Sequence, residues 1–436
     1  QNIGHHYRLY EKACFSTSVT KLTWDDQINR WIIETDRGDR MKAQFVAMAN
    51  GPLNRPKLPG IPGIDSYQGH TFHTSRWDYS YTGGDNSGNL TGLADKKVAI
   101  IGTGATAIQC IPHLGESAEH LYVFQRTPSS IDHRNNRETD PEWADSLEPG
   151  WQYRRMENFN TLVAGGDQDE DLVSDGWTDI FRTLPGPAAK LAGRKLGRRV
   201  SGREKGYLMK MADYQKMNSI RDRVDDVVQD AATAEALKPW YRQFCKRPCF
   251  HDEYLPTFNL PNVSLIDTNG NGVEAITERG VVANGVEHEG DCIIFATGFE
   301  VGTGYTRRAG YDIIGRNSQS LTEKWSNGPR TLHGMQTTDF PNCFFLGFTH
   351  TAVTVNVPQA LNEQAMHISY MISQVRDQGA EMIEATAEGE QMWVDEMLDK
   401  SKLGADFQEF PDAGNTWKLL GILEIREPIH LEMRGN

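Results

Sequence analysis

The stretch that decides the fold is VAIIGTGATA, residues 98–107, in which a short apolar strand leads directly into a glycine-rich turn. It fits the GxGxxA form of the Rossmann dinucleotide-binding fingerprint: Gly102 permits a tight turn, Gly104 lets a pyrophosphate approach the backbone, and Ala107 allows close helix packing. Phosphates are expected at the N-terminus of the following helix, where free N–H groups and the helix dipole favour an anion. The candidate cofactor-binding residues of this turn are Gly102, Thr103, Gly104, Ala105, Thr106, Ala107 and Gln109.

A second strand, residues 121–124, follows this helix and supports a dinucleotide site over the alternative, a glycine-rich turn without a ligand. NAD enzymes place a carboxylate at the end of this strand, but here the sequence reads QRTP, residues 125–128. Arg126, with Thr127 beside it, supplies a guanidinium that can pair with a 2′-phosphate, which favours NADPH. The alternative for Arg126 is a solvated surface arginine. Pro112 is expected to kink the helix or to end it early.

Outside this unit the chain changes character several times. Residues 13–49 are expected to form a strand meander, and the four prolines within residues 52–63 exclude regular structure there. Residues 131–240 carry polar and charged stretches at helical spacing, which we interpret as a helical insertion. Buried strands, apolar on both faces as in a parallel sheet, are expected at 45–49, 263–266 and 292–296.

Composition excludes several classes of protein. The chain has 45 basic and 59 acidic residues, a net charge of -14, and no basic run that could follow a phosphate backbone, so nucleic acid is not an expected partner. No apolar run is long enough for a membrane span, and the first residues do not resemble a signal peptide, so we expect a soluble, cytoplasmic protein. The six cysteines form no CxxC pair, which argues against a metal site or a disulfide framework.

The segment YQGHTFHTSRWD, residues 67–78, resembles the fingerprint of Baeyer-Villiger monooxygenases. That fingerprint is an aromatic residue, then Gly, His and Trp followed by Pro or Asp at fixed intervals; only Tyr67, where Phe is usual, departs from it. The related flavin monooxygenases that oxidise nitrogen or sulfur carry an aromatic residue and Lys where this chain has Trp77 and Asp78. These two residues therefore separate the subfamilies.

Other segments extend the resemblance over nearly the whole chain. They are ATGF (296–299) and MANG (48–51), which resemble the family's two ATG motifs, together with KWSNGPR (324–330), FPN (340–342), TVNVP (354–358) and KRP (246–248). The resemblance implies that Arg247 is the catalytic arginine, that Lys246 binds the 2′-phosphate, and that Gly298 and Asn356 contact the flavin. Taken without the family, Lys246 and Arg247 are only a basic pair at a domain joint.

The family chemistry that the resemblance implies is hydride transfer from NADPH to FAD, capture of O2 by the reduced flavin, and oxygen insertion beside a ketone carbonyl to give an ester or lactone. Arg247 would supply a fixed positive charge for the anionic oxygen species, because a guanidinium stays protonated at any working pH. His73 and Trp77 are assigned to a linker that couples the moving NADP domain to the flavin. The alternatives are a heteroatom-oxidising flavin monooxygenase and an inactive NADP-binding fragment.

The implied fold class is α/β, with two Rossmann-like dinucleotide-binding domains, for FAD and NADP, and a helical insertion. The expected division is the end of a first FAD-domain segment (1–60), a linker with the fingerprint (61–94), the first part of the NADP-binding domain (95–130), the helical insertion (131–240), the second part of the NADP-binding domain (241–297) and the FAD-domain return segment (298–436). Relatives begin with a first GxGxxG, and they carry a further loop after the position of Phe407; both are missing here. We therefore expect this chain to be an incomplete part of a larger enzyme. The identity of the ketone and the oligomeric state do not follow from the sequence.

Overall fold

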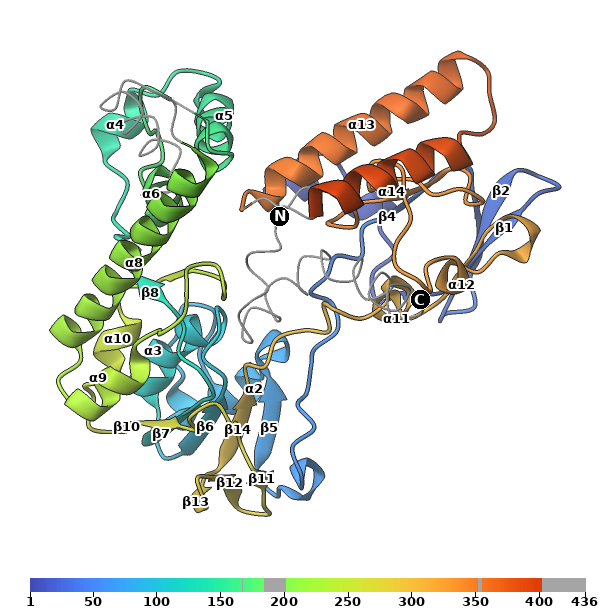
Figure 1. The fold of residues 1–436 in the computed structure, drawn as a ribbon. Coiled ribbons are helices and arrows are strands. Elements are labelled where there is room, and N and C mark those ends of the chain that lie inside the picture. Colours follow the sequence, from blue (N-terminus) through green and yellow to red (C-terminus); the bar gives the residue numbers. More distant parts are fainter. Residues whose placement is uncertain (167, 184–200, 352–354, 402–436) are drawn as a thin grey trace, which may run out of the picture.

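The computed structural model describes residues 1–166, 168–183, 201–351 and 355–401. Figure 1 shows two sheet-containing units and a helical extension. One unit is built around strands β5, β6, β7, β10 and β14, and the other around β1, β2 and β4 with helices α11–α14. The long helix α8 runs from the first of these units up to α4, α5 and α6.

The unit that carries the Gly102 turn, which we call the nucleotide-binding unit after the site expected there, is organised by a parallel sheet whose described strands follow the order β10-β7-β6-β14-β5. Their bounds are β5 His70–His73, β6 Lys97–Ile101, β7 His120–Gln125, β10 Val263–Asp267 and β14 Cys292–Phe295. Strand β14 is buried on both faces, as the sequence predicted for a covered parallel sheet, and so are four of the five residues of β6. The prediction of a buried strand at 263–266 is wrong: this strand is β10, an edge strand in which only Val263 is fully buried, because among the described strands it has a neighbour on one side alone. The fingerprint segment differs from the expectation: instead of being only a linker, it contributes the edge strand β5.

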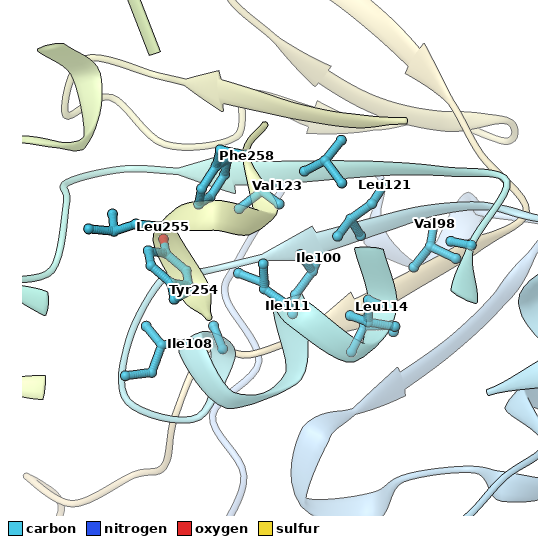
Figure 2. Close-up of a cluster of buried hydrophobic side chains, with 14 of the residues drawn as sticks. Val98, Ile100, Ile108, Ile111, Leu114, Leu121, Val123, Tyr254, Leu255 and Phe258 are labelled. Atoms are coloured by element: carbon cyan, nitrogen blue, oxygen red, sulfur yellow. The ribbon is translucent and has the colours of Figure 1, made fainter. Parts of the chain in front are cut away.

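Helices cover one face of this sheet. Helix α3 (Ala107–Ser117) and the short α10 (Tyr254–Thr257) pack over it, as Figure 2 shows for Ile108, Ile111 and Leu114. Of the two outcomes predicted for Pro112, a kink or an early end of α3, the early end is wrong, because the helix continues through the buried Pro112 to Ser117. Proline removes only one intrahelical hydrogen bond, and burial of the helix against the sheet offsets that loss.

A small antiparallel sheet covers the opposite face. Its strands are β11 (Ala275–Ile276), β12 (Gly280–Ala283) and β13 (Val286–Glu289). Phe124 and Phe295 of the parallel sheet pack with Val281 in a second buried cluster. The parallel sheet is therefore shielded from water on both faces.

The other unit contains the expected meander, formed by β1 (Val19–Asp25), β2 (Arg30–Thr35) and β3 (Arg40–Ala43). Strand β15 (Ile313–Ile314) pairs in parallel with β1. The strand expected at 45–49 is β4 (Val46–Met48), but only Met48 of it is buried. It leaves the meander and pairs in parallel with β16 (Cys343–Phe345). The remaining helices of this unit are α1 (Asn2–His6), α11 (Tyr305–Ala309), α12 (Leu321–Lys324), α13 (Val357–Asp377) and α14 (Ala387–Ser401).

The region expected to be a helical insertion contains α4 (Pro141–Asp145), α5 (Trp151–Val163), α6 (Gly176–Thr183), α8 (Gly202–Val227) and α9 (Ala231–Leu237). Helix α8 begins at a capping box, in which the Ser201 hydroxyl and the Glu204 carboxylate satisfy each other's backbone N–H groups. The short strand β8 (Ile131–Asp132) pairs in parallel with β9 (Cys249–Phe250), which joins the two ends of this region. No helix in the described ranges has the length and apolar character needed to cross a membrane.

Two segments of the chain connect the units, and they are hydrogen-bonded to each other. One is the proline-rich stretch, residues 52–63, and the other is the segment after β14 that begins with the ATGF motif, residues 296–299; we call them the crossings. The Lys57 N–H donates to the Gly298 carbonyl at 2.9 Å, and the Glu300 N–H donates to the Arg55 carbonyl at 2.9 Å. The Arg55 guanidinium also pairs with the Glu300 carboxylate at 3.2 Å. The proline-rich stretch and the second ATG motif therefore form one paired connection.

The packing of α3 on the sheet predicts the effect of a core substitution. Leu114→Ala is expected to lower the free energy of unfolding of the nucleotide-binding unit by about 2–5 kcal/mol, because this fully buried side chain leaves a cavity. Glu116→Ala, at an exposed position of the same helix, should change it by no more than about 0.5 kcal/mol. Denaturant titration measures both values, and equal effects would contradict this description of the core.

Candidate active site

Gly102 occupies a position that only glycine can fill. Its φ is +115°, and a Cβ atom there would lie 2.6 Å from the Ala296 carbonyl oxygen. Its N–H donates to the Phe124 carbonyl at 3.0 Å, which holds the turn against β7. The turn is thus fixed between β14 on one side and β7 on the other.

The rest of the turn leaves room for a ligand. Nothing lies within 4 Å of the position that a Cβ of Gly104 would take. Thr106, at the N-cap of α3, makes no side-chain capping bond, and Ala107 is fully buried under the first turn. Gln109 is tied back to the Ala105 carbonyl at 2.7 Å. Because the first N–H groups of a helix need acceptors, this geometry fits a pyrophosphate.

Polar contacts join the turn to the segment after β7. The Thr103 hydroxyl donates to the Thr127 carbonyl at 3.1 Å, and the Ser129 hydroxyl donates to the Thr103 carbonyl at 2.6 Å. The Lys246 ammonium donates to the Thr127 hydroxyl and, at 3.3 Å, to the Pro128 carbonyl. The structure therefore brings together Thr103, Thr127 and Lys246, which the sequence proposed from three separate segments.

Tyr241 is part of this group, although no sequence motif marks it. Its ring lies 5.2 Å from the Lys246 Nζ, and its hydroxyl donates to the Pro128 carbonyl at 3.0 Å. Burial raises the pKa of Tyr241 well above its usual value, so its hydroxyl remains a donor. The interaction of an ammonium with an aromatic face helps to orient Lys246 toward residues 127 and 128.

The two arginines proposed from the sequence are both exposed. Arg126 lies after the end of β7, where its carbonyl accepts from the Gly270 N–H at 2.9 Å. Arg247 lies directly after Lys246, between α9 and β9. Its charge lowers the pKa of the Cys249 thiol, but burial is the larger effect and raises that pKa to about 11. Cys249 is therefore a neutral thiol, so the charges of this loop belong to Arg247 and to its basic neighbours Lys246 and Arg242.

Trp77 and Asp78 of the fingerprint have structural contacts within the nucleotide-binding unit. The Trp77 indole N–H donates to the buried Thr82 hydroxyl at 3.0 Å, and its ring packs edge-on against Phe72. Asp78 caps the short helix α2 (Tyr79–Thr82) and pairs with the His70 Nε2 at 3.0 Å. The two residues that distinguish the subfamilies thus fix the fold of the fingerprint itself.

His73 connects the fingerprint to the crossing after β14. It is only 7% exposed, its Nδ1 accepts from the Ser75 N–H at 3.1 Å, and its ring meets the Phe299 ring edge-on. Burial lowers the pKa of His73, and this outweighs the opposing effect of the nearby Gly298 backbone. A neutral His73 therefore lies beside the second ATG motif, where it contacts the crossing between the units.

The two expected flavin contacts lie in different places. Gly298 adopts a φ of +78° within the crossing. Asn356 lies at the N-terminus of α13, where its amide donates to the Asn160 side-chain oxygen of α5 at 2.7 Å. The helical insertion therefore reaches the start of α13. Thr354 of the TVNVP motif lies outside the described residues, and so does the position of Phe407, after which relatives carry a further loop.

A cavity of about 250 Å³ lies between the crossings and the loop after β16. Its lining is rich in glycine and includes Gly51, Tyr305, Arg308, Trp325, Gly347 and His350. Burial lowers the pKa of His350 to about 4, so its imidazole is neutral. The sequence did not single out most of these residues, because they come from four segments that only the fold brings together.

Comparisons with known proteins place these observations in a family, although no protein-family model matches the chain. Neopentalenolactone D synthase of Streptomyces avermitilis is 54% identical over 411 residues, which cover 94% of this chain and 68% of that protein. A Baeyer-Villiger monooxygenase of Streptomyces coelicolor is 46% identical over 394 residues, covering 90% of this chain and 64% of that protein. The chain therefore aligns with such relatives over most of its length.

Solved structures confirm the fold. The polycyclic ketone monooxygenase of the fungus Thermothelomyces thermophila matches with a TM-score of 0.82 and 35% identity, over 99% of this chain and 70% of that one. OTEMO, solved as a complex with FAD and NADP, matches with a TM-score of 0.72 and 29% identity, over 92% and 74%. The expected α/β class with two dinucleotide-binding domains is confirmed by this likeness. The chain belongs to the Baeyer-Villiger monooxygenase family.

Proposed function

We propose that this chain catalyses the FAD- and NADPH-dependent insertion of one oxygen atom of O2 beside the carbonyl of a small-molecule ketone, giving an ester or lactone. The observation that carries the proposal is the contact of Lys246 with Thr127. It places the Lys246-Arg247 pair against the segment that contacts the glycine turn. One site therefore supplies both a cation that binds a nucleotide phosphate and a cation for catalysis. The relatives named as Baeyer-Villiger monooxygenases support this activity over heteroatom oxidation.

NADPH is assigned to the site built around the glycine turn. The turn and the N-terminus of α3 receive the pyrophosphate, while Arg126 and Lys246 receive the 2′-phosphate. Lys246 is already oriented toward residues 127 and 128 by Tyr241, so little side-chain freedom is lost when the phosphate binds. This arrangement discriminates NADPH from NADH by the presence of one extra anionic group.

Arg247 is assigned the stabilisation of negative charge at the reacting oxygen. When bound, FAD supplies the oxygen chemistry; the protein orients the reactants and excludes water. A guanidinium suits this role because it stays protonated and presents several N–H donors in a fixed plane. His73 and Trp77 hold the fingerprint between the sheet edge and the crossing, and we assign them the coupling of the two units rather than a chemical step.

The reaction class is tested by product analysis. The holoenzyme, given NADPH, 18O2 and an equimolar mixture of a cyclic ketone and a thioether, should form mainly the ester or lactone, with one labelled oxygen atom. Without NADPH, product formation should stop. A dominant sulfoxide would instead favour the heteroatom-oxidising class, and NADPH binding without oxygen consumption would indicate an inactive chain.

Arg247→Ala is expected to lower the rate of oxygenation about a hundredfold or more, because it removes charge stabilisation from the transition state. The dissociation constant for NADPH should change little, since Lys246 and the turn are intact. Arg40→Ala, at an exposed arginine of β3, is the matched control and should leave the rate unchanged. Steady-state kinetics and calorimetric titration measure the two quantities. Near-normal ester formation by Arg247→Ala would refute the assignment.

Arg126→Ala is expected to weaken NADPH binding by about 1–3 kcal/mol and NADH binding much less, because only NADPH carries the extra phosphate. Arg126→Lys keeps the charge but not the planar pair of donors, so its loss should be smaller. Titration of each variant with both cofactors measures these differences. Equal losses for NADPH and NADH would show that Arg126 supports the fold and does not recognise the phosphate.

A further inference from the structure

Buried charged residues of α8 contact the segment that carries Lys246 and Arg247. Asp213, only 5% exposed, accepts a hydrogen bond from the Gln243 N–H at 2.7 Å and pairs with the Arg242 guanidinium at 3.1 Å. These contacts lie three to five residues before Lys246 and Arg247. A carboxylate so deeply buried is costly unless its partners are fixed, so the position of residues 242 and 243 is tightly specified.

Arg223 holds the other end of the same segment. It is 7% exposed, and its guanidinium donates to the Ile131 carbonyl at 2.9 Å and to the His251 carbonyl at 3.0 Å. Ile131 belongs to β8 and His251 directly follows β9, so one side chain contacts both strands of this pair. Since Arg247 lies two residues before β9, the clamp limits how far its backbone can move.

The two anchors lie on one rigid element. Asp213 and Arg223 are ten residues apart, which corresponds to about 15 Å along an α-helix. Met217 and Ile220 between them, and Val224 directly after Arg223, are all nearly fully buried and form an apolar stripe. Figure 1 shows α8 as one continuous helix beside β8 and α9. The apolar stripe is sufficient to pack α8 against the rest of the protein. The buried Asp213 and Arg223 are therefore not needed for packing, and they instead fix the positions of the groups that they bind.

The segment itself has a backbone that needs support. Phe244 has a φ of +65°, a left-handed conformation that costs free energy in a bulky residue. The Asp213 contact to Gln243 immediately precedes it, and a hydrogen bond from the Cys245 N–H to the Arg242 carbonyl closes the turn around it. This strained turn directs the following residue, Lys246, toward Thr127.

We propose that Asp213 and Arg223 are positioning residues, which hold residues 242–251 against the nucleotide turn so that Lys246 and Arg247 reach their ligands. The proposal rests on the functions proposed above for those two residues. Asp213 positions Lys246, which is the nearer of the two along the chain to the residues that Asp213 contacts, 242 and 243. Arg223 positions Arg247 from the other side, through its contact at 251. Neither anchor touches a reactant.

The first test measures NADP+ binding and needs no catalytic turnover. Asp213→Asn keeps the size of the side chain but removes the charge that fixes Arg242 and Gln243. The dissociation constant for NADP+, measured by calorimetry, should rise about tenfold, and that for NAD+ much less. Asp222→Asn, at an exposed position of the same helix, is the control and should change neither constant.

A double-mutant cycle separates positioning from general destabilisation. In the Lys246→Met background, Asp213→Asn should have almost no further effect on NADP+ binding, because the group that it positions is gone. An equal effect in both backgrounds, or no effect in either, would overturn the role of Asp213. If Lys246→Met alone leaves NADP+ affinity unchanged, the proposed phosphate site fails, and this is visible before any coupling is measured.

Arg223 provides a second cycle that does not depend on Asp213→Asn folding. Arg223→Lys retains the charge but cannot reach both carbonyls with a planar pair of donors. It should lower the oxygenation rate about tenfold to a hundredfold in the otherwise unchanged enzyme, and less than about twofold in the Arg247→Ala background. Rate losses that multiply in the double variant would overturn the proposal for Arg223.

Discussion

The close contact between Gly102 and the Ala296 carbonyl is the constraint on which the arrangement of this protein depends. It exists because β6 and β14 are neighbouring parallel strands whose carboxyl ends lie at the same sheet edge. One strand leads into the glycine turn to which we assign the nucleotide, and the other leads into the crossing to the second unit. Any side chain at 102 would separate them. The nucleotide site and the connection between the units are therefore parts of one tightly packed edge.

From that edge, a series of polar contacts reaches into the helical region. Thr103 contacts Thr127, Thr127 contacts Lys246, and the segment that carries Lys246 is fixed to α8 by Asp213. Each contact links segments far apart in the sequence. The helical insertion thus does more than cover the nucleotide-binding unit: α8 supports the loop that bears the two basic residues assigned to phosphate binding and catalysis.

The fingerprint is explained by its contacts within the fold. His70 and Asp78 pair across a short turn, Trp77 is hydrogen-bonded to Thr82, and His73 meets the crossing beside Gly298. A single twelve-residue segment therefore forms the sheet edge, caps a helix and contacts the connection between the units. The spacing of its residues is set by the period of strand β5 and by the turn that follows it, and this explains why the motif has fixed intervals.

The sequence by itself determined the strand-turn-helix around Gly102, the presence of Arg126 in place of a carboxylate after the second strand, and the motifs that identify the family. These depend on local backbone geometry and on the side-chain types within a few residues, which a sequence displays directly. The tertiary structure alone decided that β5 joins the nucleotide-binding sheet, that β4 leaves the meander to pair with β16, and that Tyr241 and Asp213 orient the segment of Lys246. The strand pairings and the Asp213 contact join residues 30 to about 300 positions apart, and Tyr241 is held in place by Pro128, 113 positions away. Such contacts are selected by burial of whole faces and by satisfaction of buried charges, which no local pattern specifies.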